Sequence, residues 1–403
     1  MKRLAVLLVA VALAWPAAAS AQLTMQMSNG WTFSFAGNVN AFWVFAKQNN
    51  SGPATSSVRT GLLPAFATFE AKGKEAGMNL GVHFGFAPQI QNPGNTHDAF
   101  GAQIDMRQVY LTVGGRWGQI LAGRELALFG RQNIVNDMTL FGVGSVGIAN
   151  NKSGGTTLGR IGYGYLYPNF NAQVSYSSKS GTPAQLAIGV FQPSILVGDR
   201  TATGACATAV TCAYNVTKIP RVEAEFTFNQ KSGKNKYMFW AGGLWQSTSN
   251  AATGGNTASA FGGTAGVKAD ITNLSVLVSG YTGKGLGTTL MFSGHEVATN
   301  GTDLRQSDGG FAQIMYTVNK KTGLGVSYGF SRLVNNETGD TNKNVRSNLY
   351  SYTAGIYHQW TKSLKVVFEG TQEGTTGINL APVTTVAPGT KQIDVSGGFM
   401  LFF

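Results

Sequence analysis

Apolar and polar side chains alternate along much of this sequence, and that two-residue repeat is the feature that most limits its possible folds. At the C-terminal end, one set of alternate positions is apolar or Gly: Ile393, Val395, Gly397, Phe399, Leu401 and Phe403. The positions between them are polar or Gly: Gln392, Asp394, Ser396 and Gly398. Successive side chains of an extended strand point to opposite faces. The segment is therefore predicted to be a β-strand with one apolar and one polar side.

The same alternation returns in four other segments, which we expect to be strands of the same kind. These segments are residues 31–45, 221–229, 351–360 and 364–371. The polar face of the second segment carries three charges: Arg221, Glu223 and Glu225. After residue 21, Gly, Ser, Thr and Asn interrupt every apolar stretch before it reaches the roughly 18 residues of a transmembrane helix. The sequence thus predicts an all-β protein and excludes a helical inner-membrane protein.

A soluble β-sandwich would show the same alternation, because its apolar faces are buried against each other. Two features favour a β-barrel in a membrane instead. Only 12% of the 403 residues are charged, which is a poor surface for a water-soluble protein of this size. The apolar faces also end in aromatic pairs, such as Trp43 with Phe45 and Phe399 with Phe403, as expected for the girdles at the two lipid interfaces.

The connections between the expected strands alternate between short and long. Short ones fall near residues 114–117, 232–235, 272–273, 320–323 and 361–363. Long ones, rich in Gly, Asn and Thr, fall near residues 47–57, 88–103, 193–217, 249–257, 284–306, 335–346 and 374–390. Transmembrane β-barrels join their antiparallel strands by short periplasmic turns and long external loops.

The barrel is expected to be closed, because an open sheet edge in hydrocarbon leaves peptide groups unpaired at several kcal/mol each. Counting from both ends of the chain predicts about sixteen strands. The count becomes about eighteen if Tyr167-Pro168-Asn169 is a turn between two strands. Either size leaves an aqueous lumen, whereas an eight-stranded barrel fills with its own side chains.

The N-terminal residues have the pattern of a secretory signal peptide. Lys2 and Arg3 precede an apolar run over residues 4–14, and a small-residue cleavage site ends at Ala21. We expect residues 1–21 to be removed and residues 22–403 to form the barrel in the bacterial outer membrane. Loss of Lys2 and Arg3 lowers the formal charge from +12 to +10.

The two cysteines, Cys206 and Cys212, lie in a Gly-, Ala- and Thr-rich segment that we interpret as a loop. An oxidising compartment would allow them to form a small disulfide. We favour this bond over a metal site because no histidine or acidic cluster is near them in the sequence. The four histidines are also scattered without ligand spacing, so no metal or other cofactor is expected.

The run from Arg107 to Arg124, RQVYLTVGGRWGQILAGR, resembles the strand, turn and strand of Gram-negative porins that precede the loop folded into the pore. The terminal Phe403 is similar to the assembly signal of that family. The resemblance implies a long constriction loop at about residues 125–158. Leu158-Gly159-Arg160-Ile161-Gly162 resembles the strand that leaves this loop. The implied function is a water-filled channel for passive diffusion of small hydrophilic solutes and ions.

In this family, basic residues on one wall and acids on the loop together set a transverse field. By the resemblance, Arg107 and Arg160 match basic wall positions, and Arg124 closes the strand before the loop. The loop itself departs from the pattern, because its acids are balanced by bases. The charged residues of this segment are Glu125, Arg131, Asp137 and Lys152.

We therefore hypothesise that the pore prefers anions, such as organic carboxylates or phosphate, because charged rings fix ion preference and low-dielectric walls focus the field. The alternative is that several of these arginines lie at the lipopolysaccharide rim or pair with Glu223, Glu225 or Asp137. Both interpretations stay open on the sequence alone.

Two other functions are weighed against the channel. An outer-membrane barrel enzyme, such as a lipase or protease, needs a nucleophile and a base gathered at one place, and no local Ser/His signature is present. A non-conducting structural or adhesion barrel is the second alternative. Gly142–Gly147 fits a dinucleotide fingerprint, but no amphipathic helix follows it. Lys and Arg are dispersed rather than striped, which argues against nucleic acid.

The expected partners are outer-membrane lipid and lipopolysaccharide. The family resemblance also implies a homotrimer. His358 falls on an otherwise lipid-facing register, where a bare histidine would be costly and a subunit contact would accommodate it.

Overall fold

Neighbouring segments with the alternating pattern pair edge to edge until the sheet closes on itself. The computed structural model describes residues 23–49, 54–90, 104–148, 156–196, 214–250, 257–287, 296–298, 303–335, 345–376 and 389–403. Within these residues, 16 antiparallel strands form a closed ring, in which β19 (Lys391–Phe402) pairs with β2 (Thr32–Gln48). The others follow in chain order: β4 (Phe66–Glu75), β5 (Met78–Pro88), β6 (Ile104–Gly115), β7 (Gly118–Leu126), β8 (Phe170–Ser177), β9 (Ala184–Phe191), β11 (Arg221–Ser232), β12 (Asn235–Asn250), β13 (Thr257–Ile271), β14 (Leu274–Lys284), β15 (Gln306–Thr317), β16 (Thr322–Asn335), β17 (Val345–Gln359) and β18 (Leu364–Thr376).

Short strands also lie beside this ring. β1 (Leu23–Gln26) pairs with the start of β2, and β3 (Thr55–Arg59) pairs with its second half. β10 (Tyr214–Val216) pairs with the end of β12. The expected all-β barrel is confirmed with the smaller of the two strand counts, because no strand of the ring precedes Tyr167 within described residues 156–166.

The predicted division into outward apolar and inward polar faces is confirmed along the last strand. Ile393 and Phe399 point outward and are 56% and 53% exposed. Gln392 and Asp394 point inward and are buried. The same alternation holds on β11, where Arg221, Glu223 and Glu225 are all buried inside the ring.

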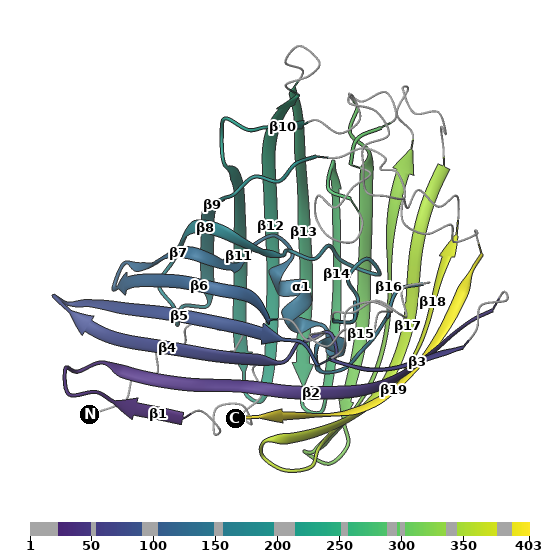
Figure 1. The fold of residues 1–403 in the computed structure, drawn as a ribbon, viewed down its shortest axis with the longest axis horizontal. Coiled ribbons are helices and arrows are strands. Elements are labelled where there is room, and N and C mark those ends of the chain that lie inside the picture. The colour runs from purple at the N-terminus through teal and green to yellow at the C-terminus, as the bar shows by residue number, and fades with distance from the viewer. Residues whose placement is uncertain are drawn as a thin grey trace.

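Tight turns join the strands at one end of the barrel. β4 and β5, for example, are connected by Ala76 and Gly77 alone, and both have positive φ, at 47° and 79°. Two-residue turns of this kind match the right-handed twist of the strands they join. The wall is uneven in height, because β12 and β13 have 16 and 15 residues whereas β8 and β9 have 8 each. In Figure 1, β4 to β8 run across the view and β12 to β18 run upward.

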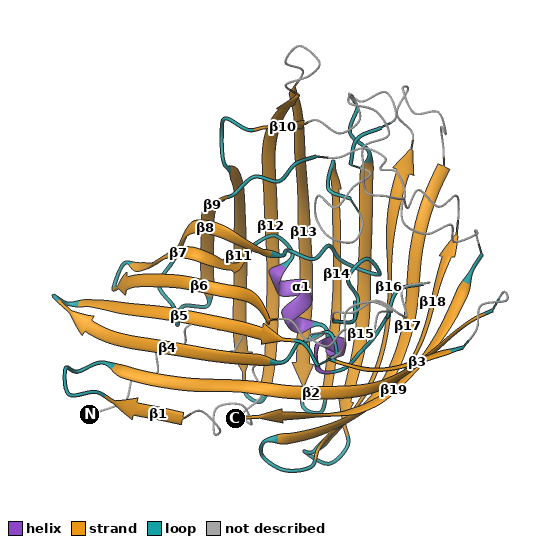
Figure 2. Cartoon of the chain, viewed as in Figure 1, coloured by secondary structure: helices purple, strands orange, loops and turns teal. Residues whose placement is uncertain are grey.

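The described parts of the connection between β7 and β8, residues 127–148 and 156–169, lie inside the barrel, and we call them the inner loop. It carries α1 (Arg131–Asn136) and the 3-10 helix η2 (Met138–Phe141), and Figure 2 shows both helices (purple) enclosed by the strands. A six-residue helix without a side-chain cap at Gly130 is not stable alone, so packing inside the barrel must hold α1. None of the helices in the described residues is both long and apolar enough to span a bilayer.

The inner loop is longer than the expected segment 125–158. Leu158–Gly162, which we expected to be a strand, remains inside the loop and forms only isolated bridges, such as Ile161 with Tyr165. The strand starts later because Pro168 has no N–H to donate and Asn169 has a φ of 61°, so a ladder cannot form before Phe170.

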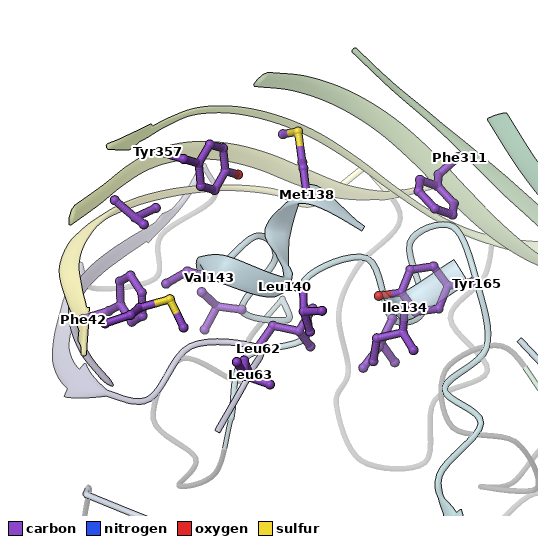
Figure 3. Close-up of a cluster of buried hydrophobic side chains, with 14 of the residues drawn as sticks. Phe42, Leu62, Leu63, Ile134, Met138, Leu140, Val143, Tyr165, Phe311 and Tyr357 are labelled. Atoms are coloured by element: carbon purple, nitrogen blue, oxygen red, sulfur yellow. The ribbon is translucent and has the colours of Figure 1, made fainter. Parts of the chain in front are cut away.

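The main hydrophobic cluster lies within the ring. Figure 3 shows apolar side chains of the inner loop, including Ile134, Met138, Leu140 and Val143, packed among inward side chains of the wall. The wall and the segment before β4 contribute Phe42, Leu62, Leu63, Phe311 and Tyr357. Burial of these side chains fixes the inner loop against one side of the lumen.

Candidate functional site

The hydrogen bonds of the inner loop to the barrel reach strands from β11 to β19, and further bonds reach β3 and residues 61–62. Asn133 of α1 is fixed by three of these strands at once. Its Oδ1 accepts from Trp240 Nε1 of β12 at 2.9 Å and from Ser279 Oγ of β14 at 2.7 Å. Its Nδ2 donates to Thr264 Oγ1 of β13 at 3.1 Å. Both ends of this buried amide are therefore bonded, as a buried polar group requires.

Two glutamates of β18 bind the middle of the inner loop through its backbone. Glu369 Oε2 accepts hydrogen bonds from Val143 N at 2.6 Å and from Gly144 N at 2.8 Å. Glu373 Oε1 accepts from Gly147 N at 3.0 Å. Charge-assisted bonds of this kind are stronger than bonds between neutral groups, so the two carboxylates hold the loop to the wall.

Two of the three charged residues on the inward face of β11, Glu223 and Glu225, contact the inner loop, and the third, Arg221, forms an ion pair with Glu223. Arg221 Nε lies 2.8 Å from Glu223 Oε1, and Glu223 Oε2 accepts from Phe129 N at 2.8 Å. Glu225 forms an ion pair with Arg131 of α1, with 2.5 Å between NH2 and Oε1. The alternative interpretation of the sequence, that several of the constriction arginines pair with Glu223, Glu225 or Asp137, thus describes Arg131.

Arg160 belongs to the inner loop and not to a strand, which corrects its expected place on the wall. Its guanidinium is fully buried and reaches two neighbouring strands. Nε donates to Ser327 Oγ of β16 at 2.8 Å, and NH1 donates to the Ser351 carbonyl of β17 at 2.6 Å. β8 begins only at Phe170, so residue 160 lies in the inner loop and can reach β16 and β17.

Asp137 joins the two helices of the inner loop and contacts no part of the wall in the described hydrogen bonds. Its Oδ1 accepts from Thr139 N at 2.9 Å, and its Oδ2 accepts from Tyr165 OH at 2.8 Å. Burial raises the pKa of this carboxyl, which lies outside the membrane-spanning strands, and the nearby Arg160 opposes that shift. Asp137 therefore shapes the loop and is hidden from a passing ion.

Arg107 lies where β6 bulges against β5, between the residues that pair with Gly85 and Phe86. Its Nε donates to Asp105 Oδ2 at 2.8 Å, and its guanidinium lies 5.7 Å from the ring centre of Phe170. The predicted basic residue of the wall is thus paired with an acid two positions earlier on its own strand.

Arg124 is exposed on the outward face of β7, where its strand neighbours are Val109 and Ala172. Its expected place in the constriction is therefore wrong. The alternation explains the error, because Glu125 occupies the inward position directly after it. Glu125 is buried, and its Oε2 accepts from Gln108 Nε2 at 2.8 Å.

The inward face of β4 to β7 is a second polar surface of the lumen, and we call it the polar wall. It carries Glu70, Lys72, His83, Tyr110 and Glu125. Lys72 Nζ lies 2.5 Å from Glu70 Oε2. Glu125 is close enough to Arg131 of α1 to interact with it electrostatically. The polar wall and the inner loop therefore interact electrostatically.

Three residues that bind the inner loop were not predicted from the sequence. Glu369 lay on the polar face of an expected strand, so the sequence predicted that it points inward. The sequence did not predict its partners, the backbone N–H groups of Val143 and Gly144. Glu373 lay beyond the end of that segment. Arg59 of β3, whose NH2 donates to Thr156 O at 3.1 Å, had no signal in the sequence.

Several expectations fall outside the described residues, among them residues 1–21, Lys152, Cys206 and Cys212. The described residues contain no group of three His, Cys, Asp or Glu side chains arranged to hold a metal ion.

Comparison with known proteins gives one family and many similar folds. A family model described as Gram-negative porin matches residues 5–377. The outer membrane channel DcaP of Acinetobacter baumannii is 13% identical over 94% of this chain and 99% of its own, with a TM-score of 0.62. The anion-selective porin from Comamonas acidovorans is 12% identical over 93% and 100%, with a TM-score of 0.61. Salmonella typhi OmpF in complex with daunomycin is 11% identical over 94% and 100%, with a TM-score of 0.54. No curated protein matches the sequence.

Proposed function

The chain belongs to the Gram-negative porin family, and from that premise we propose that its pore prefers small anions. Porins are non-enzymatic channels of the Gram-negative outer membrane, so the barrel serves passive diffusion of small solutes across that membrane. The preference for anions goes beyond the family and follows from the partners of the charged groups in the lumen.

The observation that carries this proposal is the difference in burial between three acids of the lumen and one lysine. Glu223, Glu369 and Glu373 accept hydrogen bonds from backbone N–H groups of the inner loop. In contrast, Lys268 Nζ of β13 donates to the neutral Asn136 Oδ1 at 3.3 Å. These three carboxylates are buried beneath the loop that they bind, whereas Lys268 is only partly buried. The field near the inner loop therefore favours anions.

We place the path of ions between the inner loop and the polar wall. Apolar side chains fill the opposite side, where the inner loop packs on β15 to β19. Arg131 of the inner loop and Glu125 of the polar wall lie close enough to interact electrostatically. The likeness in fold to a porin named as anion-selective agrees with the proposal.

The deciding experiment is a reversal potential in a planar bilayer with asymmetric KCl. We expect steady open-channel current and a reversal potential of the sign that anion permeation gives. A cation-selective current would refute the anion preference and leave the channel intact. The absence of any steady current would instead favour the non-conducting barrel.

We also propose a homotrimer, as is typical of the family. His358, which we expected in a subunit contact, does point outward, but its Nδ1 lies 2.9 Å from Thr322 Oγ1 of the same chain. The histidine thus has a partner without a second subunit, and the proposal depends on the family alone. Light scattering in detergent would give the mass of three chains, and a monomer mass would contradict it.

Two further proposals concern residues outside the described ranges. Residues 1–21 are removed on export, so N-terminal sequencing of protein from the outer membrane should begin at Gln22. Cys206 and Cys212 form a disulfide, so reduction should increase the mass by two hydrogens and make both thiols available to alkylation.

A further inference from the structure

The tight turns at one end of the barrel carry a large excess of positive charge, and we call their exposed bases the turn ring. All of these turns lie within the described residues. The acids at the same end are Glu75, Asp270 and the C-terminal carboxylate of Phe403. The ion pairs of the described residues include no member of the turn ring. Its members are Lys74, Arg116, Lys179, Lys231, Lys234, Lys236, Lys320, Lys321 and Lys362.

The turn ring is densest where β11 turns into β12. Lys231 and Lys236 are directly opposite each other in the strand register, and Lys234 lies in the turn between them. Like charges at opposed positions destabilise an antiparallel pair. Asp270 of β13 is opposite Lys236 on its other side, but the two form no ion pair among the described residues. The hairpin thus retains a repulsion that a bound anion would relieve.

The strand register places two of these lysines at the mouth of the lumen and not toward the lipid. Lys231 continues the inward positions of β11, and Lys236 continues those of β12, on which Trp240 binds Asn133 of α1. The inward Lys268 of β13 lies nearer to α1. Lysines therefore extend along one side of the lumen from the turn ring to the inner loop. A concave surface lined by charge of one sign concentrates ions of the opposite sign.

We propose that Lys231, Lys234 and Lys236 form a binding site for a small anion with two or more negative charges, such as inorganic diphosphate. Each lysine attracts every charge of such an anion, so binding strengthens with the charge of the ligand and is weak for chloride. The inference rests on the anion preference proposed above and deepens it, because it names multiply charged anions as the class that the turn end retains.

Binding can be measured on the folded full-length barrel without any current. Equilibrium dialysis against radiolabelled diphosphate, in a non-ionic detergent, gives the dissociation constant. In the double variant Lys231→Gln/Lys236→Gln it should rise about tenfold in 0.1 M KCl, because two partly screened attractions are lost. Binding to the wild type should weaken strongly in 1 M KCl, where the Debye length is about 3 Å.

The matched control is Lys47→Gln/Lys391→Gln, which removes the same charge from exposed positions at the other end of the barrel. It should bind diphosphate as the wild type does. Equal affinities of the two double variants would assign binding to net charge alone and overturn the site. Absence of binding to the wild type would also overturn it, whereas the reversal potential in asymmetric KCl tests the anion preference separately.

A phosphate group could also come from an anionic lipid, and a second measurement separates the two sources. Phosphatidylglycerol retained by the purified barrel is counted by mass spectrometry for the wild type and both double variants. The proposed site predicts equal retention in all three, because Lys231 and Lys236 face the mouth. Loss of this lipid from Lys231→Gln/Lys236→Gln, with diphosphate binding unchanged, would make the lysines a lipid contact and overturn the inference.

Discussion

The effect of a charged residue inside this barrel depends on its burial and its partner as well as on its sign. Glu369 faces two N–H groups of the inner loop, and Lys268 faces one amide oxygen. The sequence predicted which residues point inward, because a two-residue repeat is local. It could not predict the partners. Arg131 and Glu225, for example, are 94 positions apart and meet only because the loop folds back into the lumen.

The first prediction compares the two kinds of charge directly. Lys268→Gln should lower the anion-to-cation permeability ratio about twofold to threefold, because it removes a charge that acts on the lumen. Glu369→Gln should change the ratio much less, because Glu369 is buried beneath Val143 and Gly144 of the inner loop. Reversal potentials in 0.1 M KCl measure both variants. A larger shift in Glu369→Gln than in Lys268→Gln would contradict the proposed origin of anion preference.

At the scale of elements, the inner loop and the wall form one polar network. α1 is too short and too poorly capped to be stable alone, so its position is set by Asn133 and by burial of Ile134. The resemblance to porins indicated the start of this loop within two residues. Its end was missed, because Arg160 and Tyr165 bind partners inside the barrel that no sequence period encodes.

Replacement of Asn133 by Ala should loosen the inner loop without opening the barrel. Trp240 Nε1, Ser279 Oγ and Thr264 Oγ1 would each lose a partner, and an unsatisfied buried polar group costs about 1–3 kcal/mol. We expect noisier single-channel current with the strand content unchanged by circular dichroism. Asn229→Ala, at an exposed position of β11, is the control and should conduct as the wild type does.

A second prediction at this scale concerns the geometry of Arg160. Arg160→Lys keeps the charge but cannot bind Ser327 and Ser351 together, because an ammonium lacks the planar fork of a guanidinium. The inner loop should then become more sensitive to protease added to the folded barrel. Arg124→Lys is the matched control, because Arg124 is exposed on the outer face. Equal protection of both variants would show that Arg160 does not hold the loop.

At the scale of the whole molecule, the alternation most directly predicted that the ring of strands closes. Every strand with one lipid-facing side needs a neighbour on each edge, so the first and last strands must pair. The alternation in the sequence did not predict the height of the wall or the side chains that fill the lumen. They depend on long connections whose packing joins distant residues, as Leu62 packs with Val143 in the cluster of Figure 3.

The terminal residue tests how this closure is achieved. Phe403 N donates to Gly37 O at 3.0 Å, and Gly37 N donates to Phe403 O at 2.8 Å, so the last residue extends the seam between β19 and β2. Its ring also lies 5.1 Å from that of Phe35. Deletion of Phe403 leaves two backbone groups of Gly37 unpaired next to lipid, at several kcal/mol each.

We expect a severalfold lower yield of folded barrel, measured as the fraction that migrates faster on unheated than on heated gels. Phe399→Leu, which keeps the seam intact and changes only an outward side chain, should fold with nearly wild-type yield. Equal yields for the deletion and the control would show that the barrel closes without its last residue.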